Sequence, residues 1–427
     1  MRNKFTLYIL IAMVLGIVVG QACHVAFPDA KVAGAVAGYI SLITTVFLRL
    51  IKMLIAPLVF STLVVGIAHM GDTASVGRIG AKTMGWFISA SLVSLVLGLI
   101  MVNLLQPGAN LNLPLPDAGT ATNLKVSSLT LKEFVPHLVP ASIVEAMATN
   151  EILQIVVFSI FAGIAIASLG EKGKMLAEFA DQVAHMMLVI TGYVMKAAPV
   201  AVFAAIAATI TTQGLSVLWT YGAFILEFYA TLAILWALLA LAGFLVLGAR
   251  VKNLIARVRE PFLLAFSTAS SEAAYPKILD QLAKFGVARR IASFVLPMGY
   301  SFNLDGTMAY CTFATLFIAQ AYGVNLSAGE QITMLLLLMV TSKGMAGVPR
   351  ASLVVIAATL STFNIPEAGL LLIMGIDQFL DMGRSATNVI GNSIAAAVVA
   401  KWEGELHEDE QESAAGEPVG AHAPAAA

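Results

Sequence analysis

Apolar runs close to the length needed to cross a bilayer recur along the whole chain. They lie at roughly 5–27, 39–69, 83–105, 147–169, 185–210, 219–248, 291–322 and 367–400. A spanning helix needs roughly 20 apolar residues, whereas a membrane β-strand needs about half as many. Of the 427 residues, 59% are hydrophobic and only 11% are charged. The pattern therefore predicts an all-α, polytopic membrane protein with eight transmembrane helices.

Two further apolar segments, 261–285 and 330–363, are interrupted in the middle. The first contains a serine-rich tip at 269–274 and the second a glycine-rich tip at 344–351. At membrane depth, irregular backbone persists only where it is buried in protein or lines a cavity. We therefore expect two re-entrant helical hairpins, arranged as inverted repeats that meet near the midplane of the bilayer.

The distribution of Lys and Arg orients these segments. With eight spans, two hairpins and both termini inside, fifteen Lys and Arg residues fall on the cytoplasmic side and three on the other. Membrane proteins retain an excess of positive side chains on the cytoplasmic side. We therefore expect the N- and C-termini to be cytoplasmic.

Several functional classes are excluded by the residue types. No basic run is dense enough to indicate nucleic-acid binding, and no GxxxxGK[ST] loop indicates ATP-driven transport. The two cysteines form no metal or redox motif, so we expect no cofactor. The six histidines, at 24, 69, 137, 185, 407 and 422, leave the hairpin serines without a positioned base, which argues against an enzyme.

A polar interruption divides the run 291–322. The sequence Asn303-Leu-Asp-Gly-Thr307 places a glycine and an amide beside a carboxylate in the middle of this run. These residue types weaken the helix and free backbone carbonyls, which need partners in hydrocarbon. A desolvated cation would suit Asp305 and the freed carbonyls, and a kink satisfied by neighbouring helices is the alternative.

The last apolar run carries charged and amide side chains at helical spacing. They are Asp377, Asp381, Arg384, Asn388 and Asn392. At 100° per residue they form one stripe along one helix face. Such a stripe must face a protein or aqueous interior, where a guanidinium suits a carboxylate. The pattern predicts a small anionic substrate, with an internal Asp381–Arg384 pair as the structural alternative.

Few charges interrupt the runs of the first 250 residues: Arg49, Lys52, Lys196 and Glu227. Lys196 lies just before a proline and Glu227 near the start of a run, which favours helix-end positions for both. Arg49 and Lys52 share a helix face, where they are candidates for binding lipid headgroups.

At its polar motifs the chain resembles the dicarboxylate/amino acid:cation symporter family, which includes the glutamate transporters. The resemblance covers residues from about 5 to 405, and Leu304 replaces the methionine of one family motif. The matching positions are Ser270 and Ser271 in the first hairpin; Asn303, Asp305, Gly306 and Thr307 in the broken run; Gly347, Val348 and Pro349 in the second hairpin; and the five members of the last stripe.

The resemblance implies a role for each of these residues. Arg384 would bind the side-chain carboxylate of the substrate, and Asp381 the amino group of an amino acid. Further substrate contacts would come from Ser270, Ser271, Thr307, Val348, Ser385 and Asn388. Cation coupling would involve Glu272, Gly299, Asn303, Asp305, Asp377 and Asn392, with Gly299, Asn303 and Asn388 as candidate Na⁺ ligands.

The family also implies a glutamate-transporter-like fold, assembled as a homotrimer in the inner membrane of a bacterium. Residues 1–250 would form mainly scaffold helices, with the third and sixth spans contributing to the transport domain. Residues 251–405 would form a transport core that moves past the scaffold, as in an elevator. Residues 406–427 would form a disordered, acidic cytoplasmic tail.

Three positions depart from common family patterns. Asn392 stands where sodium-coupled members often have aspartate, which weakens one sodium site and resembles the proton-coupled carriers. Glu272 replaces the third hairpin serine and is a candidate carrier of the coupled proton. Arg350 lies at the second hairpin tip, where it pairs with Glu272 or Asp381, supplies a second carboxylate clamp or is a solvated gate residue.

Three functions are compatible with these features. The first is a symporter that takes up glutamate and aspartate with H⁺ or Na⁺, because an ammonium group in a dry site needs a partner such as Asp381. The alternative is a symporter for C4-dicarboxylates such as succinate, fumarate and malate, because Arg350 suits a substrate without an ammonium group. An anion channel, the third, would give flux without uphill accumulation.

Overall fold

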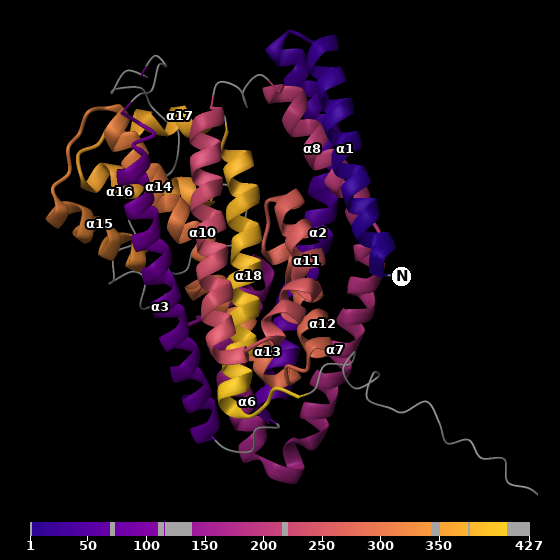
Figure 1. Ribbon diagram of the computed structural model, residues 1–427. Coiled ribbons are helices and arrows are strands. Elements are labelled where there is room, and N and C mark those ends of the chain that lie inside the picture. Colours follow the sequence, from indigo (N-terminus) through magenta and orange to yellow (C-terminus); the bar gives the residue numbers. More distant parts are fainter. Residues whose placement is uncertain are drawn as a thin grey trace, which may run out of the picture.

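The computed structural model describes residues 2–68, 73–109, 115, 139–215, 221–342, 351–374 and 376–407. Apart from one isolated antiparallel bridge between Val287 and Leu406, these residues form only helices, turns and connections (Figure 1). The predicted all-α class is confirmed for the described part of the chain.

Long helices dominate the first part of the chain. They are α1 (Arg2–Ala26), α2 (Ala30–Ala68), α3 (Thr73–Leu105), α5 (Ile143–Thr149), α6 (Ile152–Ser168), η1 (Gly170–Gly173), α7 (Lys174–Met195), α8 (Ala198–Gln213) and α10 (Gly222–Leu247).

Shorter helices follow, ending in one long helix. They are α11 (Arg250–Thr268), η2 (Glu272–Ala274), α12 (Tyr275–Phe285), α13 (Arg289–Phe302), α14 (Asp305–Ala321), α15 (Ala328–Thr341), α16 (Ala351–Thr362), η3 (Glu367–Gly369), α17 (Leu370–Met374) and α18 (Asp377–Glu403).

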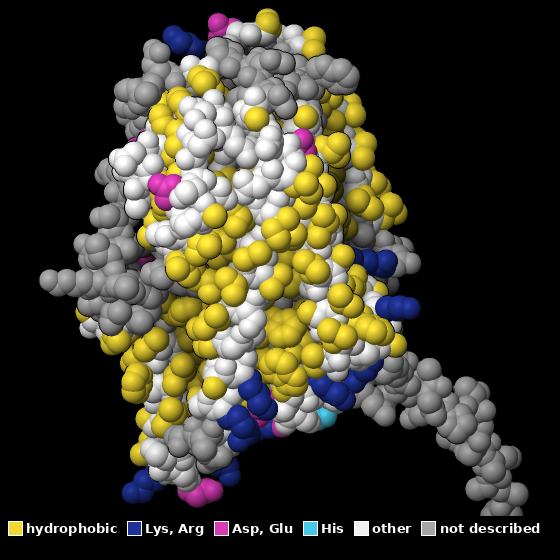
Figure 2. All heavy atoms as spheres, turned by 60° about the vertical axis from the view of Figure 1, so that its left-hand side comes forward, with side chains coloured by type: hydrophobic (Ala, Val, Ile, Leu, Met, Phe, Trp, Pro, Cys, Tyr) yellow, Lys and Arg dark blue, Asp and Glu magenta, His cyan; other side chains and the backbone are white. Residues whose placement is uncertain are grey.

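Among the described residues, four helices are long and apolar enough to cross a membrane: Leu7–Ala26, Ala30–Ala68, Ser75–Leu105 and Gly222–Leu247. On the face drawn in Figure 2, hydrophobic side chains cover the middle, while Lys and Arg side chains gather toward the lower end. These features are consistent with a multi-pass membrane protein. The eight spans and two re-entrant hairpins stay a prediction.

The run expected as one span at 185–210 is bent. It lies on the second half of α7 and on α8, and the helical segments Gly170–Met195 and Ala198–Gln213 are long and apolar enough to cross a membrane only as a pair, bent by 53°. Pro199 lies in the first turn of α8 and has no backbone N–H to continue the hydrogen-bond ladder of α7. Lys196 therefore caps the C-terminus of α7 at a helix end within the run.

Two sets of helices pack around different centres. Helices α1, α6, α7 and α8 contact one another or α2, whereas α3, α10, α11, α13 and α14 pack against α18. Figure 1 shows α18 running beside α10 and α11 through the middle of the second set. Because α3 and α10 come from the first half of the chain, the two sets do not follow chain order.

The first interrupted segment is a helix–turn–helix. Helix α11 ends at Ala269, whose φ of +50° lies in the left-handed region that usually favours glycine, and the chain returns through η2 and α12. Helices α11 and α12 pack against each other. The tip residues Ser270, Ser271 and Glu272 are all buried.

The second interrupted segment is described only in its two arms. Helices α15 and α16 pack against each other. The tip between them lies outside the described residues, and so do the predicted substrate contact at Val348 and the predicted gate at Arg350.

The predicted interruption of the run 291–322 is confirmed. Helix α13 ends at Phe302, and α14 begins at Asp305. Asn303 and Leu304 between them have ψ values of 62° and 66°, which are outside the helical range. Two non-helical residues therefore separate two helices that the sequence pattern alone joins into one span.

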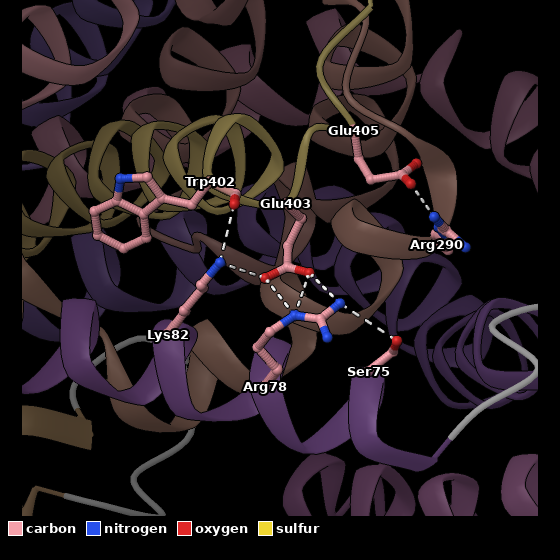
Figure 3. A network of polar contacts seen from close by, with 7 residues as sticks. All are labelled: Ser75, Arg78, Lys82, Arg290, Trp402, Glu403 and Glu405. Carbon is pink, nitrogen blue, oxygen red and sulfur yellow. Dashed lines mark hydrogen bonds and ion pairs between the residues drawn. The ribbon is translucent and has the colours of Figure 1, made fainter.

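Glu403, at the end of α18, ties this helix to α3 (Figure 3). Its carboxylate accepts hydrogen bonds from Arg78 at 3.0 and 2.9 Å and forms an ion pair with Lys82 at 2.7 Å. Lys82 also donates to the carbonyl of Trp402 at 2.9 Å. The Glu403 side chain is only 4% exposed, so these contacts compensate a carboxylate that has lost most of its water.

The segment after α18 continues this anchoring. Glu405 forms an ion pair with Arg290, and the His407 backbone N–H donates to the Gly286 carbonyl at 2.8 Å. Arg250 donates to the His407 carbonyl at 2.6 Å. The backbone of residues 405–407 thus pairs with the loop before α13. Residues 408–427 lie outside the described part.

We predict that Glu403→Gln destabilises the protein at neutral pH. Burial raises the pKa of Glu403, but Arg78 and Lys82 outweigh burial and hold it below the ordinary value of 4.5. A carboxyl with a lowered pKa stabilises the fold above its unfolded-state pKa, and this stabilisation is lost as the pH falls through its folded-state pKa. The free energy of unfolding in detergent should fall by about 1 kcal/mol at pH 7, because Arg78 is half exposed.

The pH profile of unfolding checks this prediction. The difference between wild type and Glu403→Gln should shrink as the pH falls below 4.5. Glu171→Gln is the control, since Glu171 is 93% exposed and its ion pair with Lys174 is 3.9 Å long. A difference that stays constant down to acid pH would contradict the prediction.

Candidate functional site

The polar stripe of the last run lies on α18, and its five members are fully buried. Asp377, in the first turn, stands where a helix N-terminus favours negative charge. Arg384 is among the largest fully buried side chains described. The stripe faces protein because α10, α11, α13 and α14 pack around α18. The members are Asp377, Asp381, Arg384, Asn388 and Asn392, and the neighbouring Ser385 is also buried.

Arg384 is held from two sides. Its Nε pairs with the carboxylate of Asp381, one turn earlier on the same helix. Its Nη1 donates to the hydroxyl of Thr307 on α14 at 2.9 Å. A buried guanidinium is tolerated when it is paired and hydrogen-bonded in this way. The structure therefore contains the internal Asp381–Arg384 pair that the sequence predicted as the structural alternative. Arg384 of this pair also contacts α14 through Thr307.

Asn388 joins α18 to the start of α14. Its Nδ2 donates to the Thr307 hydroxyl at 3.2 Å, and its Oδ1 accepts from the backbone N–H groups of Gly306 at 2.9 Å and Thr307 at 3.4 Å. The first N–H groups of a helix have no partner within the helix. Since the N-cap residue Leu304 has no side-chain acceptor, Asn388 caps α14 from the neighbouring helix.

The break between α13 and α14 gathers side-chain oxygens. The Nδ2 of Asn303 donates to Asp305 Oδ2 and to Asn392 Oδ1, both at 3.1 Å. Ser94 of α3 donates to the other oxygen of Asp305 at 3.4 Å. The Oδ1 of Asn303 is buried and accepts no hydrogen bond. Hard oxygen ligands of this kind suit a desolvated alkali cation as cargo.

Two glycines allow this close approach of the broken helix to α18. A Cβ at Gly299 would collide with the Asn392 amide, and a Cβ at Gly391 would collide with the Asp305 carboxylate. The carbonyl of Gly299 accepts the Asn303 backbone N–H at 2.8 Å. Four of the predicted cation-coupling residues, at positions 299, 303, 305 and 392, thus lie together. Their role in coupling stays a prediction.

Asp377 lies apart from that cluster. Tyr310 of α14 donates to its Oδ1 at 2.7 Å. Tyr310 is fully buried and lies one turn beyond Thr307 on the same helix. The hydrogen bond keeps this carboxylate on the side of α18 that faces α14, on the same stripe as Arg384.

The tip of the first hairpin lies beside α18. Ala269 and Met382 belong to one apolar cluster, which places the tip next to Asp381 along the helix. Ser270 accepts the backbone N–H of Ala273 at 3.3 Å, whereas the hydroxyl of Ser271 is buried and has no hydrogen-bond partner. A buried hydroxyl without a partner marks a place where a ligand can bond.

Glu272 faces the other set of helices. It lines a cavity of about 210 Å³ together with Ser270 of the tip and with Arg49 and Lys52 of α2. Arg49 and Lys52, the candidates for binding lipid headgroups, thus line the same cavity as a buried carboxylate.

Other contacts of the site were missed in the sequence. Ser94 and Tyr310 hold Asp305 and Asp377, yet both lie in apolar runs that predict packing alone. The spacing of Tyr310 three residues after Thr307 is the one local signal. Ser94 has none, since it reaches Asp305 from a helix 211 residues earlier in the chain.

Residues 5–402 match the sequence model of a known family, described as the sodium:dicarboxylate symporter family. The chain belongs to this family. The family is one of transporters, not enzymes, and its members are cation-coupled symporters of dicarboxylates or glutamate. The matched region includes both interrupted segments, the broken run and the polar stripe of α18.

Curated relatives resemble nearly the whole chain. A proton/sodium-glutamate symport protein of Bacillus caldotenax is 41% identical over 408 residues, which is 94% of this chain and 95% of the relative. A C4-dicarboxylate transport protein of Bacillus subtilis is 39% identical, with 95% of each chain covered. A proton/glutamate-aspartate symporter of Escherichia coli is 42% identical, with 94% of each covered.

We predict that Thr307→Val destabilises the protein more than Thr315→Val. Valine at 307 removes the hydroxyl that accepts hydrogen bonds from Arg384 and Asn388, which should cost about 1–3 kcal/mol of unfolding free energy. Thr315, two turns later on α14, is equally buried, but its hydroxyl donates within its own helix to Cys311. Denaturant unfolding in detergent measures both. Equal losses would show that the 307 hydroxyl holds no interhelical contact.

Proposed function

We propose that this chain is a secondary active symporter that takes up acidic amino acids, glutamate and aspartate, together with H⁺ or Na⁺. The observation that carries the proposal is the fully buried Arg384–Asp381 pair on α18. A guanidinium binds a carboxylate, and a carboxylate binds an ammonium group. Side by side in a dry site, the two complement a substrate that carries both groups.

The charges of the site support coupling to a cation. Three fully buried carboxylates, Asp305, Asp377 and Asp381, stand against one buried guanidinium, Arg384. An uncompensated buried charge is costly, so an anionic substrate would enter this site with cations that offset the excess. Two of the relatives carry proton, or proton and sodium, in their names, which supports H⁺ or Na⁺ as the coupling ions.

The substrate would bind between the first hairpin and α18. Its side-chain carboxylate would bind Arg384, and its amino group would bind Asp381. Its other carboxylate would be held by Thr307 and Asn388 together with Ser270, Ser271, Ser385 and the backbone at Val348. The unpartnered hydroxyl of Ser271 supports this assignment. The cations would lie at Gly299, Asn303, Asp305 and Asn392, with Asp377 nearby and Glu272 carrying a proton.

A symporter of C4-dicarboxylates is the second candidate. Relatives named C4-dicarboxylate transport protein are 37–42% identical to the chain, and relatives named for glutamate are 40–42% identical. Succinate, fumarate and malate lack an ammonium group, so Asp381 would then serve only to hold Arg384. In that case Arg350 at the second hairpin tip would supply a further clamp for a carboxylate.

The mechanism we propose is elevator-like alternating access. The helices packed around α18 would move as a transport domain past α1, α2, α6, α7 and α8. The inclusion of α3 and α10 in the moving set agrees with their contacts to α14 and α18. We further propose a homotrimer in the inner membrane of a bacterium, with both termini cytoplasmic.

Uptake into proteoliposomes tests the proposal. Labelled aspartate and labelled succinate are offered under separately imposed proton and sodium gradients. Aspartate accumulation against its gradient would support the amino-acid symporter, and accumulation of succinate alone would establish the second candidate. Flux of either that never exceeds equilibration would contradict symport and indicate a channel.

Asp381→Asn should separate the two substrates. Asparagine cannot pair with the ammonium group, and a hydrogen bond to a charged group contributes about 1.5–3 kcal/mol, so aspartate uptake should fall by about ten- to a hundredfold. Succinate uptake, if present, should be less affected. Asp280→Asn is the matched control, because Asp280 pairs with Lys284 on the half-exposed face of α12. Unchanged aspartate uptake in a folded Asp381→Asn protein would contradict the ammonium role.

Asn392→Asp should increase the sodium dependence of uptake. The substitution adds a carboxylate oxygen beside Asn303 and Asp305, where the amide now accepts a hydrogen bond from Asn303. We expect the sodium concentration for half-maximal uptake to fall by about tenfold, which corresponds to one added charge-assisted ligand. Asn103→Asp on the exposed side of α3 is the control. An unchanged sodium dependence would remove position 392 from the cation site.

A further inference from the structure

A second cavity, away from the α18 site, lies between α7 and α12. It has a volume of about 690 Å³ and is partly open. Figure 1 shows α7 and α12 side by side in this region. Helix α12 belongs with the second set, because it packs against α11, α13 and α18. Its apolar lining includes Leu188, Met195 and Leu279. Its charged lining residues are Lys196, Lys277, Lys284, Arg289, Glu260 and Asp280.

The acidic residues of this cavity are already paired. Lys277 lies 3.2 Å from Glu260, and Lys284 lies 2.9 Å from Asp280. In the described part of the chain, no carboxylate pairs with Lys196 or with Arg289, the other two bases. The cavity therefore presents two positive charges in excess beside an apolar wall.

Arg289 adds a more specific feature. It begins α13, and its Nη2 is buried without a hydrogen-bond acceptor among the described residues. Lys196 lies at the bend between α7 and α8, with its ammonium 5.8 Å from the ring centroid of Tyr193. A buried guanidinium donor without an acceptor is costly, which points to an anionic ligand that completes it.

Gln281 defines a second requirement for the ligand. It is 2% exposed and donates through Nε2 to Asp280 at 3.0 Å, while its Oε1 accepts no hydrogen bond. A ligand that completes this cavity must therefore offer an anion to Arg289 and a hydrogen-bond donor to Gln281. A phosphate diester with a hydroxylated headgroup has both, and its acyl chains match the apolar wall.

We propose that the cavity between α7 and α12 binds the headgroup of an anionic, hydroxylated membrane phospholipid. Arg289 binds the phosphate, Lys196 supplies the second positive charge, and Gln281 accepts a bond from a headgroup hydroxyl. The ligand contacts α7 of one helix set and α12 and α13 of the other. It therefore stabilises the arrangement of the two sets seen here, and it does so independently of the transported substrate.

Binding of phosphatidylglycerol to the full chain tests this proposal. The protein is placed in nanodiscs of phosphatidylcholine, phosphatidylglycerol is titrated in, and the melting temperature and the number of retained lipids in native mass spectrometry are measured. Phosphatidylglycerol should raise the melting temperature and be retained through delipidation. Arg289→Gln and Lys196→Gln should each weaken retention by about tenfold, as expected for the loss of one charged contact.

Lys172→Gln is the matched control, since Lys172 is exposed on η1 and should leave retention unchanged. If Arg289→Gln does not fold, Arg289→Lys, which keeps the charge, replaces it in the retention measurement. Equal effects of phosphatidylglycerol and phosphatidylcholine on the wild type, or equal retention in wild type and variants, would overturn the proposal. Stabilisation by inorganic phosphate alone would keep an anion site and overturn its assignment to a lipid.

Discussion

The burial of Arg384 is the constraint on which the rest of the core depends. A guanidinium away from water is tolerated only if its charge is paired and its donors are accepted. Asp381 provides the charge from the same helix, and Thr307 provides an acceptor from α14. Because the Thr307 hydroxyl also accepts from Asn388, and Asn388 caps α14, the contacts around Arg384 also hold the first turn of α14.

The same contacts link the substrate region to the cation region. Asn388 holds the start of α14, and two residues before that start Asn303 bridges Asp305 and Asn392. A ligand that competes for Arg384 or Thr307 acts on a helix end that also positions the oxygen cluster. Two sites that share one structural element can influence each other's affinity, and the influence is reciprocal. This arrangement supplies a physical route for the coupling that we propose.

Much of the site could be predicted from local sequence because its spacing is helical. The stripe from Asp377 to Asn392 needs only the 3.6-residue period, and the break at Asn303 needs only the weak helix propensity of the residues around Gly306. Pro199 indicated a helix end at Lys196, but the bend of 53° within one apolar run was not predicted. Local patterns predict which residues share one face of a helix. They do not predict which other helix packs against that face.

The sequence by itself determined the helical class, the burial of one polar stripe and the position of the broken helix, because each follows from hydrophobicity and period within one segment. Only the tertiary structure decided the partners. Ser94 reaches Asp305 across 211 residues of sequence, and Arg78 reaches Glu403 across 325. Tyr310 meets Asp377, and Arg49 faces the cavity at Glu272. Buried polar groups need partners, but packing between distant helices decides which side chain supplies each one.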